Sequence, residues 1–500
     1  MENREPKSLN LKILSGATWT VLQMVVSRLI SFLVSLILAR VLLPEHFGIV
    51  GMAVVFTGLF SAIGDLGLGA ALIQFKEDLL KQIHLDTAFW LSLLFNTVVF
   101  ILLAAVIAPL GVRFYDEQIL RLVIPVMGMS ILFSPFSLIH RILLTRELRF
   151  KALSIIAVYS ALGAGTAAVA LALSGAGVWS IVIQTVLASL LPIPVLWRTT
   201  RWTPRFRFSR QAFHEIFGFS LYDALQRTLS YLSRNVDTLL VGKMLGSELL
   251  GFYSFAYTLT DVFRQHLMSV LNKVMFPVYG QLQEDIRAVK RNYLRVVKYN
   301  TLLITPIMLL LIYFAGEVIP LFFGEKWLPA VVPVQAMAAA SIIHAVGGTS
   351  DSVLKGLGRF KLNFRITAFR IFLVIFPVFF VCVYFWGILG AAAAVVVRKL
   401  FTRFIYQYHL RKVINVSEME LLRSVKSAFI GAFVTIPVYL LFELAGTASV
   451  WVLAAAGAAI GSTYLAAVWL LEKEELKWAA GRIAQLVQRN RESSDGDRTG

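Results

Sequence analysis

The segment Arg40-Val-Leu-Leu-Pro-Glu-His-Phe-Gly48 returns later in the chain, in altered form, as Lys243-Met-Leu-Gly-Ser-Glu-Leu-Leu-Gly251. A shift of 203 residues superposes the leading basic residue, one leucine, the glutamate and the final glycine of the two segments. Each segment separates two long apolar runs. A conserved spacing of this kind indicates that the chain arose by duplication.

A second pair of segments supports the duplication. Arg149-Phe-Lys151 recurs as Arg359-Phe-Lys361, at a shift of 210 residues. Two matches at nearly the same shift make coincidence a poor explanation. If each repeat holds six membrane spans, an even number, both halves enter the membrane in the same direction. The halves are then related by an axis along the membrane normal, as in membrane proteins built from parallel repeats.

The composition requires a lipid environment. The chain has 500 residues, of which 58% are hydrophobic and only 15% are charged, whereas soluble domains average about 25% charged residues. Its mean hydropathy is +0.75. A soluble protein of this length is therefore excluded, and an all-α polytopic membrane protein is expected.

The apolar runs predict about fourteen membrane spans, because a bilayer core of about 30 Å needs about 20 apolar residues per helix. The first run is much longer than the core of a cleavable signal peptide, so we expect it to remain in the membrane. The predicted spans are 13–42, 47–72, 85–110, 118–142, 152–174, 177–197, 213–242, 249–277, 294–316, 329–355, 363–385, 387–410, 424–444 and 448–471.

The charges between spans predict the orientation. Connections after odd-numbered spans carry few charges, and connections after even-numbered spans are basic. One basic connection holds Arg198, Arg201, Arg205, Arg207 and Arg210. Lys and Arg collect on the cytoplasmic side, so both termini are expected in the cytoplasm of a bacterial inner-membrane protein. The same pattern explains the net charge of +18 without a nucleic-acid partner.

The spans divide the chain into four parts. We expect an N-lobe over 13–200, a C-lobe over 211–412, two extra helices over 423–472 and a cytoplasmic tail over 473–500. No loop is long enough to fold into a catalytic domain, so the chain is not expected to be an enzyme. Cys382 is the single cysteine, which excludes an intrachain disulfide. No metal-ligand spacing and no nucleotide-binding loop occur, and no cofactor is expected.

Charged residues inside spans are the candidate functional residues, because each costs roughly 2.5–3.5 kcal/mol at a helix centre. Asp223, Arg227, Ser230, Arg234 and Asp237 step by three or four positions along the seventh span and share one helical face. Such a face cannot contact lipid. Spans one, two and eight also carry charges, and the resulting candidates for a cavity between the two halves are Arg28, Asp65, Asp223, Arg227, Arg234, Asp237, Asp261 and Arg264.

The arginines predict an anionic ligand, because a guanidinium matches phosphate in a bidentate manner and keeps its charge. The aspartates leave three roles open: they could position the arginines, bind a coupling cation, or contact sugar hydroxyls. A structural alternative also stays open. Asp223 with Arg227, and Arg234 with Asp237, could be intrahelical pairs that lower the cost of membrane insertion.

Three segments carry a resemblance to a known family: Leu42-Leu-Pro-Glu-His-Phe-Gly48, Gly64-Asp-Leu-Gly-Leu-Gly-Ala-Ala-Leu-Ile-Gln74, and Arg149-Phe-Lys151. They resemble the bacterial polysaccharide flippases (O-antigen, colanic acid and exopolysaccharide) of the multidrug/oligosaccharidyl-lipid/polysaccharide exporter superfamily. The resemblance covers nearly the whole chain. It implies two six-helix lobes arranged in a V, two extra C-terminal helices and transport by alternating access.

The resemblance also implies a function: flipping of a polyprenyl-diphosphate-linked oligosaccharide from the cytoplasmic to the periplasmic leaflet, for surface polysaccharide biosynthesis. The expected partners are this lipid-linked substrate, membrane lipids, and a polysaccharide polymerase or export machinery. The alternative is a cation-coupled drug or small-molecule antiporter of the same superfamily, which would favour an acidic cavity. A membrane glycosyltransferase would need a large catalytic loop, and a scaffold protein would not need matching polar faces in both halves.

Overall fold

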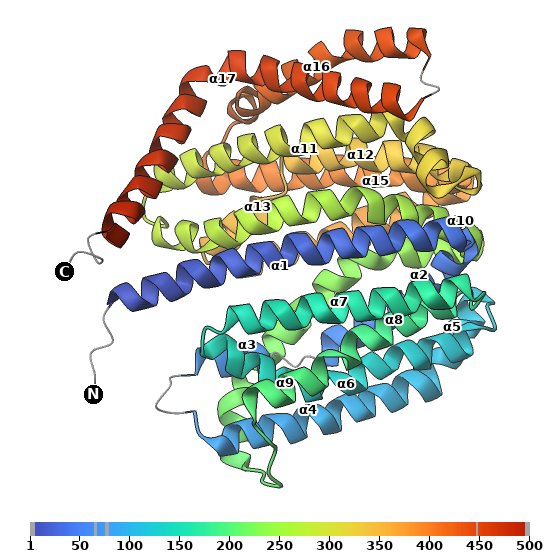
Figure 1. Ribbon diagram of the computed structural model, residues 1–500, viewed down its shortest axis with the longest axis vertical. Coiled ribbons are helices and arrows are strands. Elements are labelled where there is room, and N and C mark those ends of the chain that lie inside the picture. Colours follow the sequence, from blue (N-terminus) through green and yellow to red (C-terminus); the bar gives the residue numbers. More distant parts are fainter. Residues whose placement is uncertain (1–5, 65–67, 76–79, 447–448, 496–500) are drawn as a thin grey trace. The chain divides into compact units, whose positions relative to one another are not determined.

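We describe the fold from a computed structural model, which defines residues 6–64, 68–75, 80–446 and 449–495 (Figure 1). Side chains of some helical residues are not described, among them residues 214–227, 265–267 and 474–495. Asp65 therefore lies outside the described residues, and so do the side chains of Asp223 and Arg227. Throughout the described ranges the regular structure is helical, and no strand occurs in them.

The first half of the chain folds into helices that follow the predicted apolar runs closely. They are α1 (Pro6–Val41), α2 (Pro44–Gly64), α3 (Leu68–Gln74), α4 (Gln82–Leu102), the π-helical turn η2 (Leu103–Ile107), α5 (Ala108–Tyr115), α6 (Leu120–Arg146), α7 (Phe150–Leu173), α8 (Trp179–Leu190) and α9 (Pro192–Thr200). The second predicted span, 47–72, differs from the structure, because α2 ends at Gly64 and α3 begins at Leu68.

The second half contains two very long helices. Its elements are α10 (Arg210–Gln281), α11 (Ile286–Phe323), the 3-10 turn η3 (Glu325–Ala330), α12 (Val331–Ala345), α13 (Ser350–Gly356), α14 (Phe360–Phe369), the π-helical turn η4 (Arg370–Ile375), α15 (Phe376–Ile414), α16 (Glu418–Ala445) and α17 (Val450–Asp495). α10 is broken at Gly246, where φ is 83°, and α15 is broken at Gly387, where φ is 55°. Glycine adopts such left-handed conformations without a steric penalty.

The described helices account for the predicted spans. Eleven helical segments are long and apolar enough to cross a membrane. One of these, residues 360–414, contains two predicted spans separated by the break at Gly387. The remaining two predicted spans form α10, separated by the break at Gly246. The chain is therefore a multi-pass, all-α membrane protein with fourteen predicted spans. The described part of each span is mostly helical, and the tenth, 329–355, is interrupted by a turn over 346–349 between α12 and α13.

The helices form two compact units. The first unit consists of residues 1–255, 319–330 and 367–391, and the second of residues 256–318, 331–366 and 392–500. In the first unit α1 packs lengthwise on α7 (Figure 1). This approach is close because Gly165 of α7 lies against Val34 of α1, where an added Cβ would come within 2.6 Å of a Val34 methyl group. Small residues allow such close approach of membrane helices.

The second unit holds the two C-terminal membrane helices, α16 and α17, side by side (Figure 1). Tyr313 of α11 stacks on Tyr439 of α16 with ring centroids 4.5 Å apart. Lys298 of α11 pairs with Glu472 of α17 at 2.5 Å, and both side chains are only 13% exposed. These contacts attach α16 and α17 to α11.

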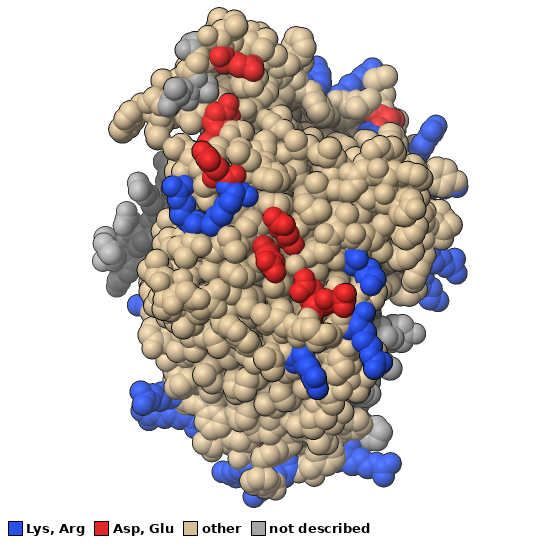
Figure 2. Space-filling model, turned by 90° about the vertical axis from the view of Figure 1, so that its right-hand side faces the viewer, with Lys and Arg blue, Asp and Glu red and all other residues tan. Residues whose placement is uncertain are grey.

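The surface agrees with a membrane environment. Most of the face in Figure 2 is uncharged, and its charged side chains lie in a few groups. Many large apolar side chains are exposed along the described helices, such as Leu94, Phe372 and Leu465, each more than 60% exposed. Apolar exposure on this scale is expected for side chains that face lipid rather than water.

Candidate functional site

The two repeated segments found in the sequence contact each other within the first unit. Gly48 of α2 lies against the backbone of Ser247, and Gly251 lies against the backbone of Pro44. The contact is reciprocal, because Pro44 and Ser247 are themselves equivalent at the shift of 203 residues. Ser247 is held in place by its hydroxyl, which donates to Glu117 Oε1 at 2.6 Å. We call these four residues, Pro44, Gly48, Ser247 and Gly251, the glycine seal.

The turn η3 closes the same end of the first unit by capping α1. The last four carbonyl groups of a helix lack intrahelical partners. The indole of Trp327 donates to the Ala39 carbonyl at 2.8 Å, and Lys326 Nζ donates to the carbonyls of Arg40 and Leu42 at 2.9 and 2.7 Å. Trp327 is fully buried and stacks on Phe255, with ring centroids 4.3 Å apart.

The packing of α2 on α10 extends beyond the glycine seal. The Tyr231 hydroxyl donates to the Val54 carbonyl at 2.7 Å, and the Tyr231 ring lies directly on Gly58. From Gly48 to Gly58 the contact covers ten residues, or about 15 Å of helix. About half of a 30 Å hydrocarbon core is thus closed between these helices.

Two of the predicted arginines lie deep in the membrane-spanning region of the first unit. Arg28 of α1 and Arg234 of α10 both have exposed side chains. Arg28 precedes the end of α1 by 13 residues, and Arg234 precedes the break at Gly246 by 12. These separations correspond to about 18–20 Å of helix. An exposed guanidinium at such a depth requires water or an anionic partner.

Asp237 does not lie on an open surface. Its side chain is fully buried. One carboxylate oxygen accepts a hydrogen bond from the Tyr253 hydroxyl at 2.9 Å, and the other accepts from the Thr238 backbone amide at 3.0 Å. The pairing connects the two halves of α10 across the break at Gly246. This environment is that of a structural carboxylate in the first unit, although a role in transport stays a prediction.

Asp261 and Arg264 belong to the second unit, where they form an ion pair within α10. Their side chains are 10% and 11% exposed, respectively. Arg264 Nη1 also approaches Met268 Sδ at 4.0 Å. The pair has the arrangement considered above for Asp223 with Arg227 and for Arg234 with Asp237, namely opposite charges that neutralise each other within one helix. It is equally compatible with a carboxylate that positions a guanidinium for a ligand.

Arg370 is a candidate that the sequence analysis did not single out. It begins the π-helical turn η4, and its Nη2 donates to the Ser233 hydroxyl of α10 at 3.1 Å. Ser233 precedes Arg234 directly. π-helical turns are rare and occur frequently at functional sites. The rule that selected the other arginines, a charge well inside a predicted span, would also have selected Arg370 in the span 363–385.

Solved structures with a similar fold are membrane transporters. The lipid II flippase MurJ in an inward closed conformation has a TM-score of 0.72 at 13% identity, with 93% of this chain and 100% of that chain covered. An inward-facing multidrug resistance MATE family transporter of the MOP superfamily has a TM-score of 0.65 at 15% identity, with 78% and 94% covered. Fold and site therefore define a membrane protein with the fold of MOP-superfamily transporters.

Sequence relatives identify the family. A profile of the family described as "Polysaccharide biosynthesis protein" matches residues 37–332. The chain is 27% identical to teichuronic acid biosynthesis protein TuaB of Bacillus subtilis, over 71% of this chain and 74% of TuaB. It is 24% identical to lipopolysaccharide biosynthesis protein WzxC of Escherichia coli, over 74% and 75% of the two chains. The chain belongs to the polysaccharide biosynthesis protein family.

Proposed function

We propose that the protein is a flippase that moves a polyprenyl-diphosphate-linked oligosaccharide from the cytoplasmic to the periplasmic leaflet. Family membership supports a role in polysaccharide biosynthesis. A third relative is named as a transport protein: succinoglycan biosynthesis transport protein ExoT of Rhizobium meliloti, which is 26% identical over 68% of both chains. The observation that carries the proposal is the exposure of Arg28 and Arg234 deep in the membrane-spanning region.

The arginines supply what a diphosphate head group lacks in a bilayer. Transfer of a charged, sugar-bearing group into hydrocarbon without partners is prohibitive. Arg28 and Arg234 would provide charge-assisted hydrogen bonds to the diphosphate oxygens. Arg227 and Arg264 are further proposed contacts. Asp65, Asp223, Asp237 and Asp261 would position these arginines, bind a coupling cation or contact sugar hydroxyls.

The glycine seal supports transport by alternating access. It packs α2 against α10 at one end of the first unit, and in this proposal a substrate head group does not leave there while Gly48 and Gly251 remain packed. The Lys and Arg distribution predicts that this end is periplasmic. Opening the seal would release the head group outward. In this proposal no covalent bond of the substrate changes, so the protein is a transporter rather than an enzyme.

The proposed cellular setting follows from the same topology. The chain would lie in the inner membrane with both termini in the cytoplasm. The two six-helix lobes over 13–200 and 211–412 would rock against each other, with the helices over 423–472 added at the C-terminal end. The substrate would come from lipid-linked assembly in the cytoplasmic leaflet and pass to a polysaccharide polymerase or export machinery.

The test is complementation in a host that lacks its own flippase. Arg28→Ala and Arg234→Ala should each reduce surface polysaccharide and trap lipid-linked intermediates inside the cell, at normal protein levels. Arg359→Ala, which removes an arginine from a connection between spans, is the matched control and should export normally. Normal export in both cavity variants would contradict the proposal.

The same host separates the flippase from the alternative antiporter. A cation-coupled drug antiporter of the MOP superfamily would confer resistance to cationic drugs and leave surface polysaccharide unrestored. The MATE transporter above shares the fold at 15% identity, so the fold alone does not decide between the two. Restored polysaccharide without drug resistance would support the flippase.

A further inference from the structure

A basic and aromatic segment connects α9 to α10 in the first unit. Its sequence is Arg201-Trp-Thr-Pro-Arg-Phe-Arg-Phe-Ser-Arg210. It has little regular structure of its own, yet it is attached to neighbouring helices at several points. We call residues 201–210 the strap. The proposed transport mechanism gives this segment no role.

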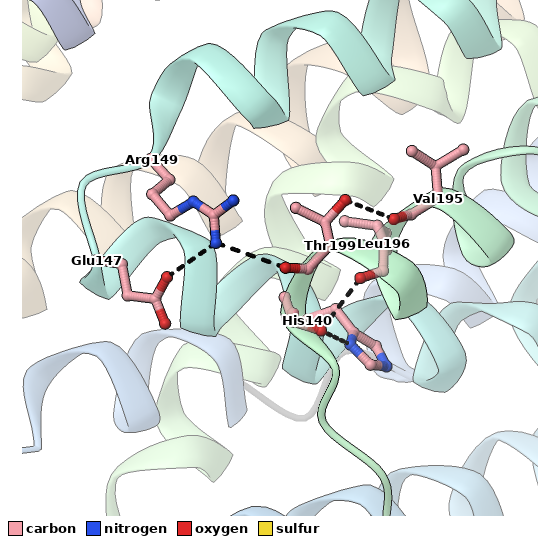
Figure 3. Close-up of polar contacts among 7 residues, drawn as sticks. His140, Glu147, Arg149, Val195, Leu196 and Thr199 are labelled. Carbon is pink, nitrogen blue, oxygen red and sulfur yellow. Dashed lines mark hydrogen bonds and ion pairs between the residues drawn. The ribbon is translucent and has the colours of Figure 1, made fainter.

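The strap begins at a fixed point. Arg149 Nη1 lies 3.5 Å from the Thr199 carbonyl and 3.4 Å from Glu147 Oε2, and so connects the end of α9 to the start of α7 (Figure 3). The next residue, Thr200, lies with its hydroxyl 2.5 Å from His140 Nδ1. Trp202 is then buried against Phe89 and His140. The end of α9 is therefore held by Arg149 and His140, and Trp202, near the start of the strap, is held by α4 and α6.

The middle and end of the strap are held by the first turns of α4. The backbone amide of Arg205 donates to Asp86 Oδ1 at 3.1 Å, and the Trp90 indole donates to the Arg205 carbonyl at 2.8 Å. Asp86 itself is fully buried. The Ser209 amide donates to Thr87 Oγ1 at 3.1 Å. A buried carboxylate that accepts from a loop amide fixes the path of the strap backbone.

This fixed backbone presents charge and aromatic surface together. The side chains of Arg201, Arg205, Arg207 and Arg210 are all exposed. Phe206 is 90% exposed and Phe208 is 61% exposed. Phe206 occupies the apex of a tight turn, closed by the Arg207 amide on the Arg205 carbonyl at 2.7 Å, and stacks on Trp90 at 4.3 Å. The exposure of two phenylalanine rings to water is unfavourable, and the four guanidinium groups beside them give this apolar surface a positive charge.

The position of the strap indicates its ligand. It joins the end of α9, which completes the candidate membrane span Trp179–Thr200, to the start of α10, so we expect it at the level of the lipid head groups. Aromatic rings favour this level, and each Lys or Arg near an anionic leaflet contributes about 1 kcal/mol of attraction. We propose that the strap binds anionic phospholipid head groups, with Phe206 and Phe208 inserted among the acyl-chain ends.

The strap would thus anchor one end of the first unit to the leaflet that the charge pattern predicts to be cytoplasmic. Its ligand is a phosphodiester in a lipid surface, not free phosphate. The rigidity of the strap favours binding, because little conformational entropy is lost when the lipid is held. This inference is independent of the proposed flipping activity.

The experiment uses a fluorescent reporter at Thr203, which is exposed in the strap. Thr203→Cys is made in a Cys382→Ala background, which removes the single native cysteine, and is labelled with an environment-sensitive dye. Short-chain phosphatidylglycerol, short-chain phosphatidylcholine or inorganic phosphate is titrated into the full-length protein in neutral detergent. Phosphatidylglycerol should shift the emission to shorter wavelength with saturation, and the other two should not. Equal responses to both lipids would overturn the proposal.

Variants identify the groups responsible. Arg205→Gln with Arg207→Gln should raise the half-saturating phosphatidylglycerol concentration by more than tenfold, at about fivefold per guanidinium. The matched control, Arg411→Gln with Lys412→Gln, removes two exposed charges at the end of α15 and should leave it unchanged. Phe206→Ser with Phe208→Ser should abolish most of the blue shift.

A measurement on the labelled reporter protein, in which all four strap arginines and both phenylalanines are retained, keeps the test valid if these variants fold poorly. Raising salt from about 0.05 to 0.5 M should weaken the phosphatidylglycerol response of the reporter protein, since exposed charges are screened. A response that is insensitive to salt, or that inorganic phosphate reproduces, would show that the strap is not a site for an anionic lipid surface.

Discussion

Gly48 and Ser247 are in backbone contact: a Cβ added at Gly48 would lie 1.6 Å from the Ser247 carbonyl oxygen. The equivalent contact joins Gly251 to Pro44, where the distance would be 1.9 Å. The chain thus uses one contact twice, once in each direction, as expected for two copies of a segment related by a pseudo-twofold axis. Only glycine permits this approach, because any side chain would enter space occupied by the opposing backbone.

Replacement of Gly48 by Ala should therefore separate α2 from α10 at the seal. The added methyl group meets backbone atoms that cannot rotate away, and overpacking of this kind costs about 1–3 kcal/mol. We expect a lower thermal unfolding midpoint in detergent for Gly48→Ala. Gly251→Ala should have a similar effect for the same reason.

The double variant makes this prediction more specific. Once Gly48→Ala has separated the two backbones, the methyl group added by Gly251→Ala has more space. The double variant should therefore lose less free energy of unfolding than the sum of the two single variants. Gly461→Ala in α17 is the control, because an added Cβ there meets nothing within 4 Å and alanine favours helix. Additive losses would show that the two glycines act independently.

Trp327 should contribute more to stability than a hydrophobic residue of its size, because it also caps α1. Trp327→Ala removes a fully buried ring and should cost about 3–5 kcal/mol. Trp327→Phe keeps most of the packing against Phe255 but leaves the Ala39 carbonyl without its donor, at about 1–3 kcal/mol. Thermal unfolding of both variants checks the order. If Trp327→Phe matched the wild type, the cap would carry no stability.

Variants of the Asp261–Arg264 pair can separate its contribution to stability from a contribution to transport. Arg264→Ala removes the positive charge beside a largely buried carboxylate and should destabilise the protein by about 3–5 kcal/mol. Asp261→Ala with Arg264→Ala removes both charges and should recover much of that stability.

Transport by the double variant then decides the role of the arginine. If Arg264 contacts the substrate head group, the double variant should fold yet fail to export polysaccharide in the complementation assay. Full export by a stable double variant would assign the pair to membrane insertion alone, the role that the sequence left open for Asp223 with Arg227 and for Arg234 with Asp237.

The sequence predicted the helices well because each membrane span must itself be long and apolar enough to cross the bilayer, and this property can be read from about 20 consecutive residues. The apolar runs gave fourteen spans, and the breaks at Gly246 and Gly387 lie where polar or glycine-containing connections were expected. The repeat at a shift of 203 residues identified Gly48 and Gly251 as equivalent. It did not predict that these two glycines contact each other, since equivalence in sequence does not specify distance in space.

The remaining features depend on contacts between distant residues. Lys326 caps the carbonyl of Leu42 across 284 residues, and neither residue carries a local signal of that pairing. The burial of Asp237 also follows from Tyr253, which lies beyond the break in α10. The polar stripe on the seventh span predicted a hydrated face, and Arg234 is exposed while Asp237 is buried. The helical spacing alone could not distinguish exposed from buried members of the stripe, and the hydrated cavity stays a prediction.

Arg370 provides the last prediction, because it is an intramembrane charge that packs on the same helix as Arg234. Its guanidinium reaches the Ser233 hydroxyl from the π-helical turn η4. If the guanidinium also contributes to the head-group site, Arg370→Ala should reduce polysaccharide export by about tenfold or more, the effect of one lost charge-assisted hydrogen bond. Arg370→Lys should retain part of the activity, because the positive charge remains while the bidentate geometry is lost. Ser233→Ala removes the hydroxyl acceptor and leaves the charge, so equal losses in Ser233→Ala and Arg370→Ala would assign the contact to helix packing, whereas normal export in Arg370→Ala would exclude Arg370 from the head-group site.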